Sequence, residues 1–286
     1  MPNHPDIAEV QATRPPFDAE AGFQRSRPPQ MDWRPGQGLN NLPQSTSLFA
    51  GDQPITTIDP SSPDVAAGDV YKLMCGGIAP RPVALVGTLD DDGVPNLAPI
   101  SWYQMVSHSP ALVMLSFGGP GAARKNSEVN IKSRKQFTIS SSSEPYVEAL
   151  NYASIDAPRG VNEFHLVGLT PQPSDVVAPP RVKEAPFALE CELDFSKDWS
   201  NSQGVHTTTM VIGRILRVHI RSDCIDPSTG SLDPARTMPV SRFGGLLFAR
   251  STIGYDLVRP KFEEAKETEE VKSRLEDATK PFVPSQ

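Results

Sequence analysis

Short runs of apolar residues separated by turn signals mark the middle of the chain as a series of β-strands. Residues 83–88 (VALVGT) are apolar and rich in β-branched side chains, and an Asp-Asp-Asp-Gly turn signal separates them from residues 96–101 (NLAPIS), so the two segments predict a β-hairpin. The longest strand pattern lies at residues 207–220. In residues 187–195 apolar and acidic residues alternate, which is typical of a strand with one solvated face. Further strands are predicted at residues 111–117 and 136–140, near Val240 and at residues 246–248.

Helical patterns are fewer and shorter. Residues 125–133 and 146–154 predict two helices between strands, and residues 6–13 predict a short helix near the start of the chain. The middle of the chain is therefore expected to be mainly β with a few helices, and its strands to pair antiparallel in a barrel or a sandwich.

Proline content divides the chain into parts. The sequence has 30 prolines in 286 residues, about twice the average of ~5%. Eleven of them fall in the first 65 residues, where they block helices and remove backbone donors from strands. We therefore predict a Pro-rich N-terminal extension at residues 1–65, a folded domain at 66–260, and a charged, helical C-terminal tail at 261–286. The sequence leaves open whether the extension is free or held by its aromatic residues Phe17, Phe23, Trp33 and Phe49.

The charge balance and the cysteines narrow the functional classes. Lys and Arg number 27 against 34 Asp and Glu, a net charge of −7, which argues against a nucleic-acid binder or a protein of anionic membranes. No apolar run approaches the ~18 residues of a membrane-spanning helix, and the first residues lack the apolar core of a secretory signal. The three cysteines are far apart and no His pair has metal-ligand spacing. We expect a cytoplasmic protein without a metal site.

Two segments have the composition of a ligand site. Asn96, Ala98 and Ser101 combine small size with polar groups, so a flat ligand could approach the backbone of this strand. An ordinary hairpin with polar residues is the alternative.

The second segment is RKNSEVN at residues 124–130, which opens a predicted helix. With Asn126 or Ser127 as the N-cap, the helix N-terminus and the charges of Lys125 and Arg124 would suit a phosphate group. A capped surface helix explains the same residues. His206, just before the longest strand, could face a ligand, although a lone His more commonly has a structural role.

Six blocks together resemble the flavin reductase-like, FMN-binding split-barrel family, in its flavoredoxin-like or flavoprotein oxygenase branch. They occur in the family's order and cover about residues 70–255. The blocks are RPVALVGTLDDDGVPNLAPISWYQMVSHSPALVMLSF (81–117), RKNSEVNI (124–131), GVNEFHLVGLTPQPS (160–174), PRVKEAPFALECEL (180–193), VIGRI (211–215) and SRFGGLLFA (241–249).

The resemblance implies a Greek-key split β-barrel that forms a homodimer and holds FMN, with FAD as the alternative, near the subunit interface. It places four groups of residues around the flavin. These are Arg81, Pro82 and Thr88 beside the flavin; Asn96, Leu97, Ala98 and Ser101 at the ring or the ribityl chain, with Trp102 flanking the ring; Lys125, Ser127 and Asn130 at the phosphate; and Ser241, Arg242 and Gly244 closing the pocket from the other subunit.

The resemblance also implies an FMN-dependent oxidoreductase that passes electrons from NAD(P)H or another donor to flavin or a partner protein. A non-catalytic FMN electron carrier or flavin-binding module is the alternative. A pyridoxamine-phosphate oxidase-like enzyme fits the block order less well, and a purely structural protein is the remaining possibility. Thr208 stands where short NADH:flavin reductases carry a His, so the use of nicotinamide is left open and no catalytic residue is predicted.

Overall fold

The computed structural model describes residues 6–49, 51, 54–118 and 123–282. The chain forms two compact units, and each is described by itself. The larger unit is made of Met1–Phe23 and Pro63–Thr252, and the smaller of Gln24–Ser62 and Ile253–Gln286.

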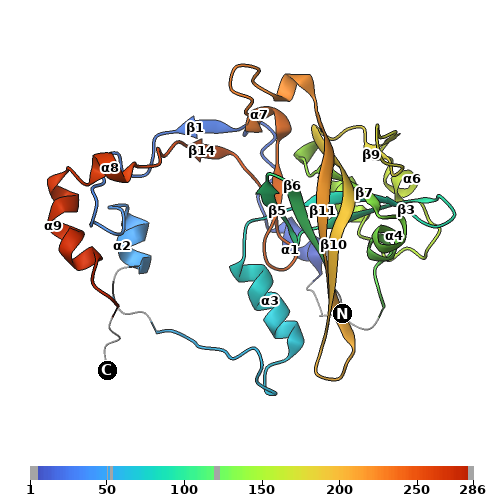
Figure 1. Ribbon diagram of the computed structural model, residues 1–286, viewed down its shortest axis with the longest axis horizontal. Coiled ribbons are helices and arrows are strands. Elements are labelled where there is room, and N and C mark those ends of the chain that lie inside the picture. Colours follow the sequence, from blue (N-terminus) through green and yellow to red (C-terminus); the bar gives the residue numbers. More distant parts are fainter. Residues whose placement is uncertain (1–5, 50, 52–53, 119–122, 283–286) are drawn as a thin grey trace. The chain divides into compact units, whose positions relative to one another are not determined.

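A seven-stranded sheet forms the body of the larger unit (Figure 1). Its strand order is β4-β3-β7-β10-β11-β6-β5, and every neighbouring pair is antiparallel. The predicted mainly β domain with antiparallel pairing is thereby confirmed. The strands are β3 (Ala84–Leu89), β4 (Pro95–Ile100), β5 (Tyr103–His108), β6 (Ala111–Gly118), β7 (Gln136–Ser141), β10 (Phe187–Ser200) and β11 (His206–Ile220).

The connection between β4 and β5 shows that this sheet curls on itself. The two strands are the opposite edges of the strand order, yet only Ser101 and Trp102 separate them in the chain. Three residue steps span at most about 11 Å, so the two edges must lie near each other. The backbone N–H of Ser116 on β6 donates to the carbonyl oxygen of Trp102 at 2.9 Å, which ties this link to the far side of the sheet.

The apolar run of β3 has both faces buried. Ala84 and Val86 belong to a cluster enclosed by the curled sheet, together with Phe117 and Phe137. Leu85, on the opposite face, packs in a second cluster under α5 and α6. Because successive side chains of a strand point to opposite faces, one continuous apolar run supplies both cores.

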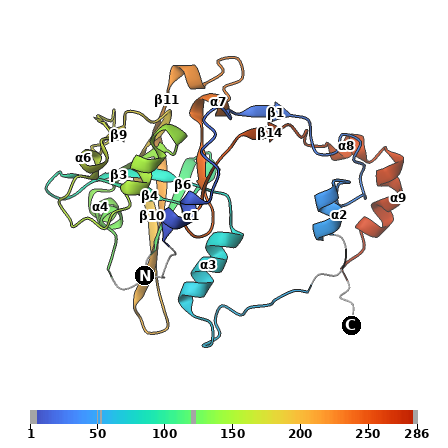
Figure 2. The same cartoon turned by 180° about the vertical axis from the view of Figure 1, so that it is seen from behind.

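Short helices and strands surround the sheet. Figure 2 shows α4 on the side of the sheet where it packs against β3 and β4. None of the helices in the described ranges is long and apolar enough to cross a membrane. These elements are α1 (Ile7–Ala12), α3 (Ala67–Gly77), α4 (Asn126–Arg134), η1 (Glu144–Tyr146), α5 (Val147–Tyr152), α6 (Glu163–Val167), η2 (Ser222–Cys224) and α7 (Pro234–Thr237), with the strands β2 (Arg81–Pro82), β8 (Pro171–Gln172), β9 (Arg181–Val182), β12 (Val240–Arg242) and β13 (Phe248–Arg250).

The smaller unit joins segments from both ends of the chain. Its strand β1 (Gln24–Ser26) pairs in parallel with β14 (Ile253–Tyr255). Its helices are α2 (Pro43–Phe49), α8 (Phe262–Ala265) and α9 (Glu269–Ala278). The predicted domain boundaries at residues 65 and 260 stay predictions.

The extension residues before β1 belong to the larger unit and contact its surface. The guanidinium of Arg250 lies 4.3 Å from the centre of the Phe17 ring and donates to the carbonyl oxygen of Asp18 at 2.5 Å. Phe17 and Asp18 of the extension therefore contact Arg250 of the folded body.

Two details of the strand prediction are wrong. The edge strand β5 is missing from it, because YQMVSH has no apolar alternation and exposes Met105 and Val106. Glu190 on β10 is fully buried rather than solvated. Its carboxylate accepts the backbone N–H groups of Asp175 and Val176, each at 2.7 Å, so the acid is satisfied by a loop distant in the sequence.

We predict that Gly213→Ala destabilises the larger unit. A Cβ at Gly213 would overlap the Cζ atom of Phe137, whose ring is completely buried in the core. The expected loss is about 2 kcal/mol of unfolding free energy, as for other overpacked cores, and urea denaturation measures it.

Gly68→Ala is the matched control, because a Cβ at Gly68 meets no atom within 4 Å and lies in helix α3. This variant is expected to keep or slightly raise the stability. Equal losses in both variants would contradict the assigned overlap.

Candidate functional site

A cavity of about 350 Å³ lies where β4, the Ser101–Trp102 link, the end of β6 and the start of α4 meet. Such a volume is at the lower end of the ~300–1,000 Å³ typical of small-molecule sites. The cavity brings together six of the residues predicted for a flavin site, which are Asn96, Ala98, Ser101, Trp102, Lys125 and Ser127.

The start of α4 forms the polar end of this cavity. The N-cap is Lys125, and no described side chain caps the helix, so the predicted cap by Asn126 or Ser127 is wrong. Ser127 Oγ instead accepts a hydrogen bond of 2.9 Å from Asn96 Nδ2 on β4. The N–H groups of the first turn are thus left for a ligand, and the helix dipole favours an anion there.

Lys125 and Arg124 differ in whether their charges are already paired with an acidic side chain. Lys125 is exposed, lines the cavity and forms no ion pair with any residue that the structure describes. Arg124 pairs with Glu128, and with Asp198 at 2.7 Å. Of the two predicted cations, only Lys125 is therefore available to a ligand.

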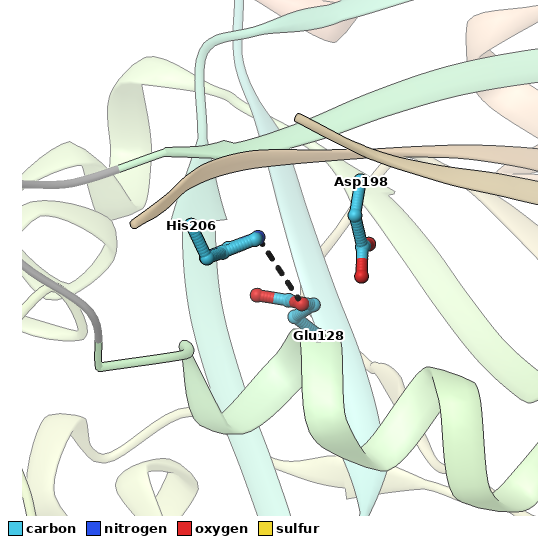
Figure 3. A group of neighbouring side chains, drawn as sticks. All are labelled: Glu128, Asp198 and His206. Atoms are coloured by element: carbon cyan, nitrogen blue, oxygen red, sulfur yellow. Dashed lines mark ion pairs between the residues drawn. The ribbon is translucent and has the colours of Figure 1, made fainter. Parts of the chain in front are cut away.

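A cluster of charged side chains fixes α4 to the β10–β11 hairpin. Figure 3 shows Glu128 of α4 pointing toward Asp198 and His206 on the two long strands. Lys132 lies 2.5 Å from Asp198 and 3.5 Å from the buried carboxylate of Glu128. Hydrogen bonds from Arg124 and Lys132 hold the pKa of Asp198 far below its usual range.

This cluster is better explained as a structural bridge than as a metal site. Glu128 and Asp198 are balanced by the two cations Arg124 and Lys132, so a further cation would meet little net negative charge. His206 Nε2 lies 2.8 Å from Thr209 Oγ1 and 4.0 Å from Glu128. The ring of His206 therefore faces this cluster, and the residue does not line the cavity.

Aromatic side chains form another part of the cavity wall. The rings of Trp102 and Tyr71 are 6.1 Å apart at an interplanar angle of 40°. Trp102 packs closely on Gly118, where a Cβ would lie 2.9 Å from Trp102 Cζ3. Burial raises the pKa of Tyr71, and the neighbouring Cys75 adds to this rise. Sequence reasoning missed Tyr71, because α3 lies before the blocks that carry the resemblance and a lone Tyr gives no signal.

Three further predicted residues are buried beside the cavity. Asn130 Nδ2 donates to Thr88 Oγ1 at 3.0 Å, which links α4 to β3. The side chain of Leu97 belongs to the core under α5 and α6. In this chain these residues support the cavity wall from behind and do not line it.

The remaining predicted residues do not line this cavity, although Arg81 Nε donates to the Oγ atom of Ser101, a residue of the cavity wall, at 3.5 Å. Pro82 and Ser241 face each other on β2 and β12, and both line a different cavity of about 300 Å³. The guanidinium of Arg81 donates to the carbonyl oxygens of Ile78 and Phe243, each at 3.0 Å.

The other two residues of this group pack locally. The guanidinium of Arg242 lies 4.3 Å from the centre of the Phe248 ring. Gly244 passes so close to Gly76 that a Cβ would lie 3.2 Å from its Cα. The structure therefore does not bring Arg81, Pro82 or the 241–244 block into the cavity of their own chain.

A sequence model described as the flavin reductase like domain matches residues 76–251. The chain belongs to the flavin reductase-like family. The predicted family is thus confirmed over the part of the chain that holds the cavity, the sheet and α4.

Solved structures agree with this membership. Nitrilotriacetate monooxygenase component B from Bacillus cereus is 30% identical, with 72% of this chain and all of that one covered at a TM-score of 0.68. 2-Nitrobenzoate 2-nitroreductase from Pseudomonas fluorescens is 29% identical, with 72% of this chain and 98% of that one covered at a TM-score of 0.64. A protein from Shewanella frigidimarina, whose structure is described as that of a flavin reductase with a split barrel domain, is 21% identical, with 69% of this chain and 94% of that one covered at a TM-score of 0.58. The predicted split-barrel fold is confirmed.

A flavin is the cofactor class of this family, and the cavity fits its chemistry. A flavin phosphate needs N–H donors and a cation, which the start of α4 and Lys125 supply. A planar ring needs apolar and aromatic walls, which Trp102 and Tyr71 provide.

A second acidic group in this flavin reductase-like chain also has a structural role. Glu190 accepts three backbone N–H groups of the loop at 175–177, and His219 Nε2 lies 2.6 Å from its Oε1. Burial works to raise the pKa of Glu190, but the N–H groups of Asp175 and Val176 together with His219 hold it below the usual range. All these contacts favour the carboxylate as an acceptor, so no metal is needed to explain it.

We predict that Glu190→Gln lowers the unfolding free energy by about 2 kcal/mol at pH 7, because one charged acceptor of several N–H groups is lost. A depressed pKa in the folded state stabilises the fold above the ordinary Glu pKa of about 4.3, and this contribution is lost as the pH falls through the folded value. The difference from the wild type should therefore shrink below about pH 4. Urea denaturation at several pH values measures it.

Asp175→Asn is the control from the same cluster, since the side chain of Asp175 is exposed. A loss that is the same at pH 3.5 and at pH 7 in Glu190→Gln would contradict the assigned carboxylate contacts.

Proposed function

We propose that the cavity between β4 and α4 binds FMN and that the chain works as an FMN-dependent oxidoreductase. The proposal depends on one observation: a single cavity contains the uncapped start of α4, the side chain of Lys125 and a pair of aromatic rings. The names of two relatives, a monooxygenase component and a nitroreductase, describe oxidoreductase systems and support this reaction class.

Strand β4 would set the distance between the two ends of the flavin. Asn96 lies beside Ser127 at the polar end, and Ser101 precedes Trp102 at the aromatic end. At about 3.3 Å per residue, the five steps from Asn96 to Ser101 span roughly 16 Å. An elongated ligand with a charged tail and a flat ring matches this arrangement better than a compact one.

The residues of the chain would bind and orient the cofactor, and the bound flavin would supply the electron transfer. Lys125 and the N–H groups of α4 would hold the phosphate. Asn96 would hydrogen-bond to the polar chain, and Ala98 would leave room for the ring beside the strand. Trp102 would exclude water from one side of the ring.

The electron donor is proposed to be NAD(P)H or a reduced partner protein, and the acceptor free flavin or a partner such as an oxygenase. Thr208 pairs with Gly118 beside Trp102, at the position where short NADH:flavin reductases of the family carry a His. A reduced partner protein is therefore the donor to test next to NAD(P)H. The cytoplasmic location also stays a prediction, supported by three buried cysteines that form no disulfide.

We further propose a homodimer in which the 241–244 block completes the cavity of the partner subunit. This block and Pro82 lie outside the cavity of their own chain, although the resemblance assigns them to the flavin site.

We predict that Lys125→Ala weakens FMN binding about tenfold, the effect of ~1.4 kcal/mol, and riboflavin binding less than twofold. Only FMN carries the phosphate that Lys125 would neutralise. Flavin fluorescence titration measures both constants. Lys183→Ala is the control, because Lys183 is exposed and outside the cavity.

Equal losses for FMN and riboflavin would contradict the role of Lys125. A yellow protein that binds FMN but neither oxidises NAD(P)H nor accepts electrons from a partner would favour the alternative function, a non-catalytic FMN carrier.

We also predict that subunits with Lys125→Ala and with Arg242→Ala complement each other. If each site takes Lys125 from one subunit and Arg242 from the other, a mixed dimer contains one intact site. Each parent dimer is then expected to bind FMN weakly, and the purified mixed dimer to bind about one FMN per dimer with wild-type affinity. A mixed dimer as weak as its parents would contradict the shared site.

A further inference from the structure

One buried acid of the cavity has no part in the function proposed above. Glu163 lies in the first turn of α6, is only 4% exposed, and lines the same cavity as Lys125 and Ser127. Its Oε2 atom accepts the backbone N–H of Leu97 at 2.9 Å. Since β4 is an edge strand, this bond replaces the missing neighbour strand.

Strand β4 connects Glu163 to the polar end of the cavity. Leu97, which donates to Glu163, directly follows Asn96, which donates to Ser127 Oγ. The carboxyl group of Glu163 and the start of α4 are thus joined through two consecutive residues of one strand. An ionised carboxylate at this place would repel the phosphate that the polar end is proposed to bind.

We propose that Glu163 is a positioning residue that couples proton uptake to the binding of a phosphate-bearing flavin, so that the phosphate is held best when Glu163 is neutral. The proposal rests on the proposed function. When Glu163 is protonated, its carboxyl group keeps an oxygen for the Leu97 N–H and gains a donor that can face the cavity.

The surroundings of Glu163 support a neutral form. Burial raises the pKa of Glu163 above the usual range, while the hydrogen bond from Leu97 works in the opposite direction. Strand β4 (PNLAPI) brings no charged side chain to it. The charged residues that line the cavity with it are Arg124, Lys125 and Asp156. Further charged or titratable groups on the neighbouring elements are Glu128 at the start of α4, Glu148 on α5, His165 on α6 itself, and Arg159 before α6, which pairs with Asp91.

Of these groups, Arg124 and Glu128 pair with each other. The charges that share the open cavity with Glu163 are therefore Lys125 and Asp156. They have opposite signs, so the protonation of Glu163 decides whether the wall presents a net negative charge to the phosphate.

Glu163→Gln tests the proposal, because the amide keeps an acceptor for Leu97 and is neutral at every pH. At pH 8 the variant is expected to bind FMN about five- to tenfold more tightly than the wild type, and riboflavin within twofold. The difference between the two proteins is expected to shrink as the pH is lowered and Glu163 of the wild type becomes protonated. The FMN phosphate itself titrates near pH 6. The ratio of the FMN dissociation constants of the two proteins at each pH removes that effect.

Asp156→Asn is the matched control, because Asp156 is an exposed acid of the same cavity. It is expected to tighten FMN binding less than Glu163→Gln does, because water screens the charge of an exposed carboxylate. Equal tightening in both variants, or FMN binding by Glu163→Gln at pH 8 that is equal to or weaker than the wild type, would overturn the proposal and leave the proposed function intact.

A measurement on the unaltered protein covers the case in which the variant does not fold. Calorimetry in buffers of different ionisation enthalpy, repeated over a pH series and corrected for the protons that the FMN phosphate itself exchanges, should show that the wild-type protein takes up more protons on binding FMN than on binding riboflavin. Equal uptake, or proton release with FMN, would overturn the proposal. Absence of any flavin binding by the wild type at every pH would instead contradict the proposed function itself.

Discussion

The site depends on the closure of the sheet between two strands that follow each other in the chain. Because β4 and β5 are the opposite edges of one sheet, the Ser101–Trp102 link must cross the place where those edges approach. The two edges form no strand pair across it, so the backbone of β4 keeps an open edge. The cavity lies along that edge, which explains why its walls come from β4, from this link and from the end of β6.

The second requirement is a helix whose start faces the cavity without being neutralised by its own side chains. The buried carboxylate of Glu128 holds α4 to the long hairpin, and it occupies Arg124 in doing so. Removing one charge from such a network leaves a buried partner without compensation, so the network fixes the position of the helix strongly. Lys125, one residue away, extends from a rigid support while its own charge stays free.

Local sequence patterns predicted the helices and strands around the site better than they predicted which residues line it. The hairpin, α4 and the long strands could be predicted because the periodicity of apolar residues and the presence of turn residues are local properties of the sequence. Strand β5 was not, because its stability comes from its pairing with β6 and not from its own pattern. Burial of Glu190 and participation of Tyr71 depend on contacts with residues far away in sequence or on closure of the sheet. The resemblance alone assigned Arg81 and the 241–244 block to the flavin site, and none of these residues lines the cavity of its own chain.

The charges on the cavity wall set a limit on how an anion can bind. Lys125 is opposed by Asp156, and Arg124 is already paired, so side chains alone give little net attraction. A helix start contributes the equivalent of about half a positive charge and several aligned N–H donors. An anion is therefore held mainly by the N–H donors and the dipole at the start of a fixed helix. In such a site one buried acid can change the balance about as much as an exposed lysine, because burial weakens the screening by water.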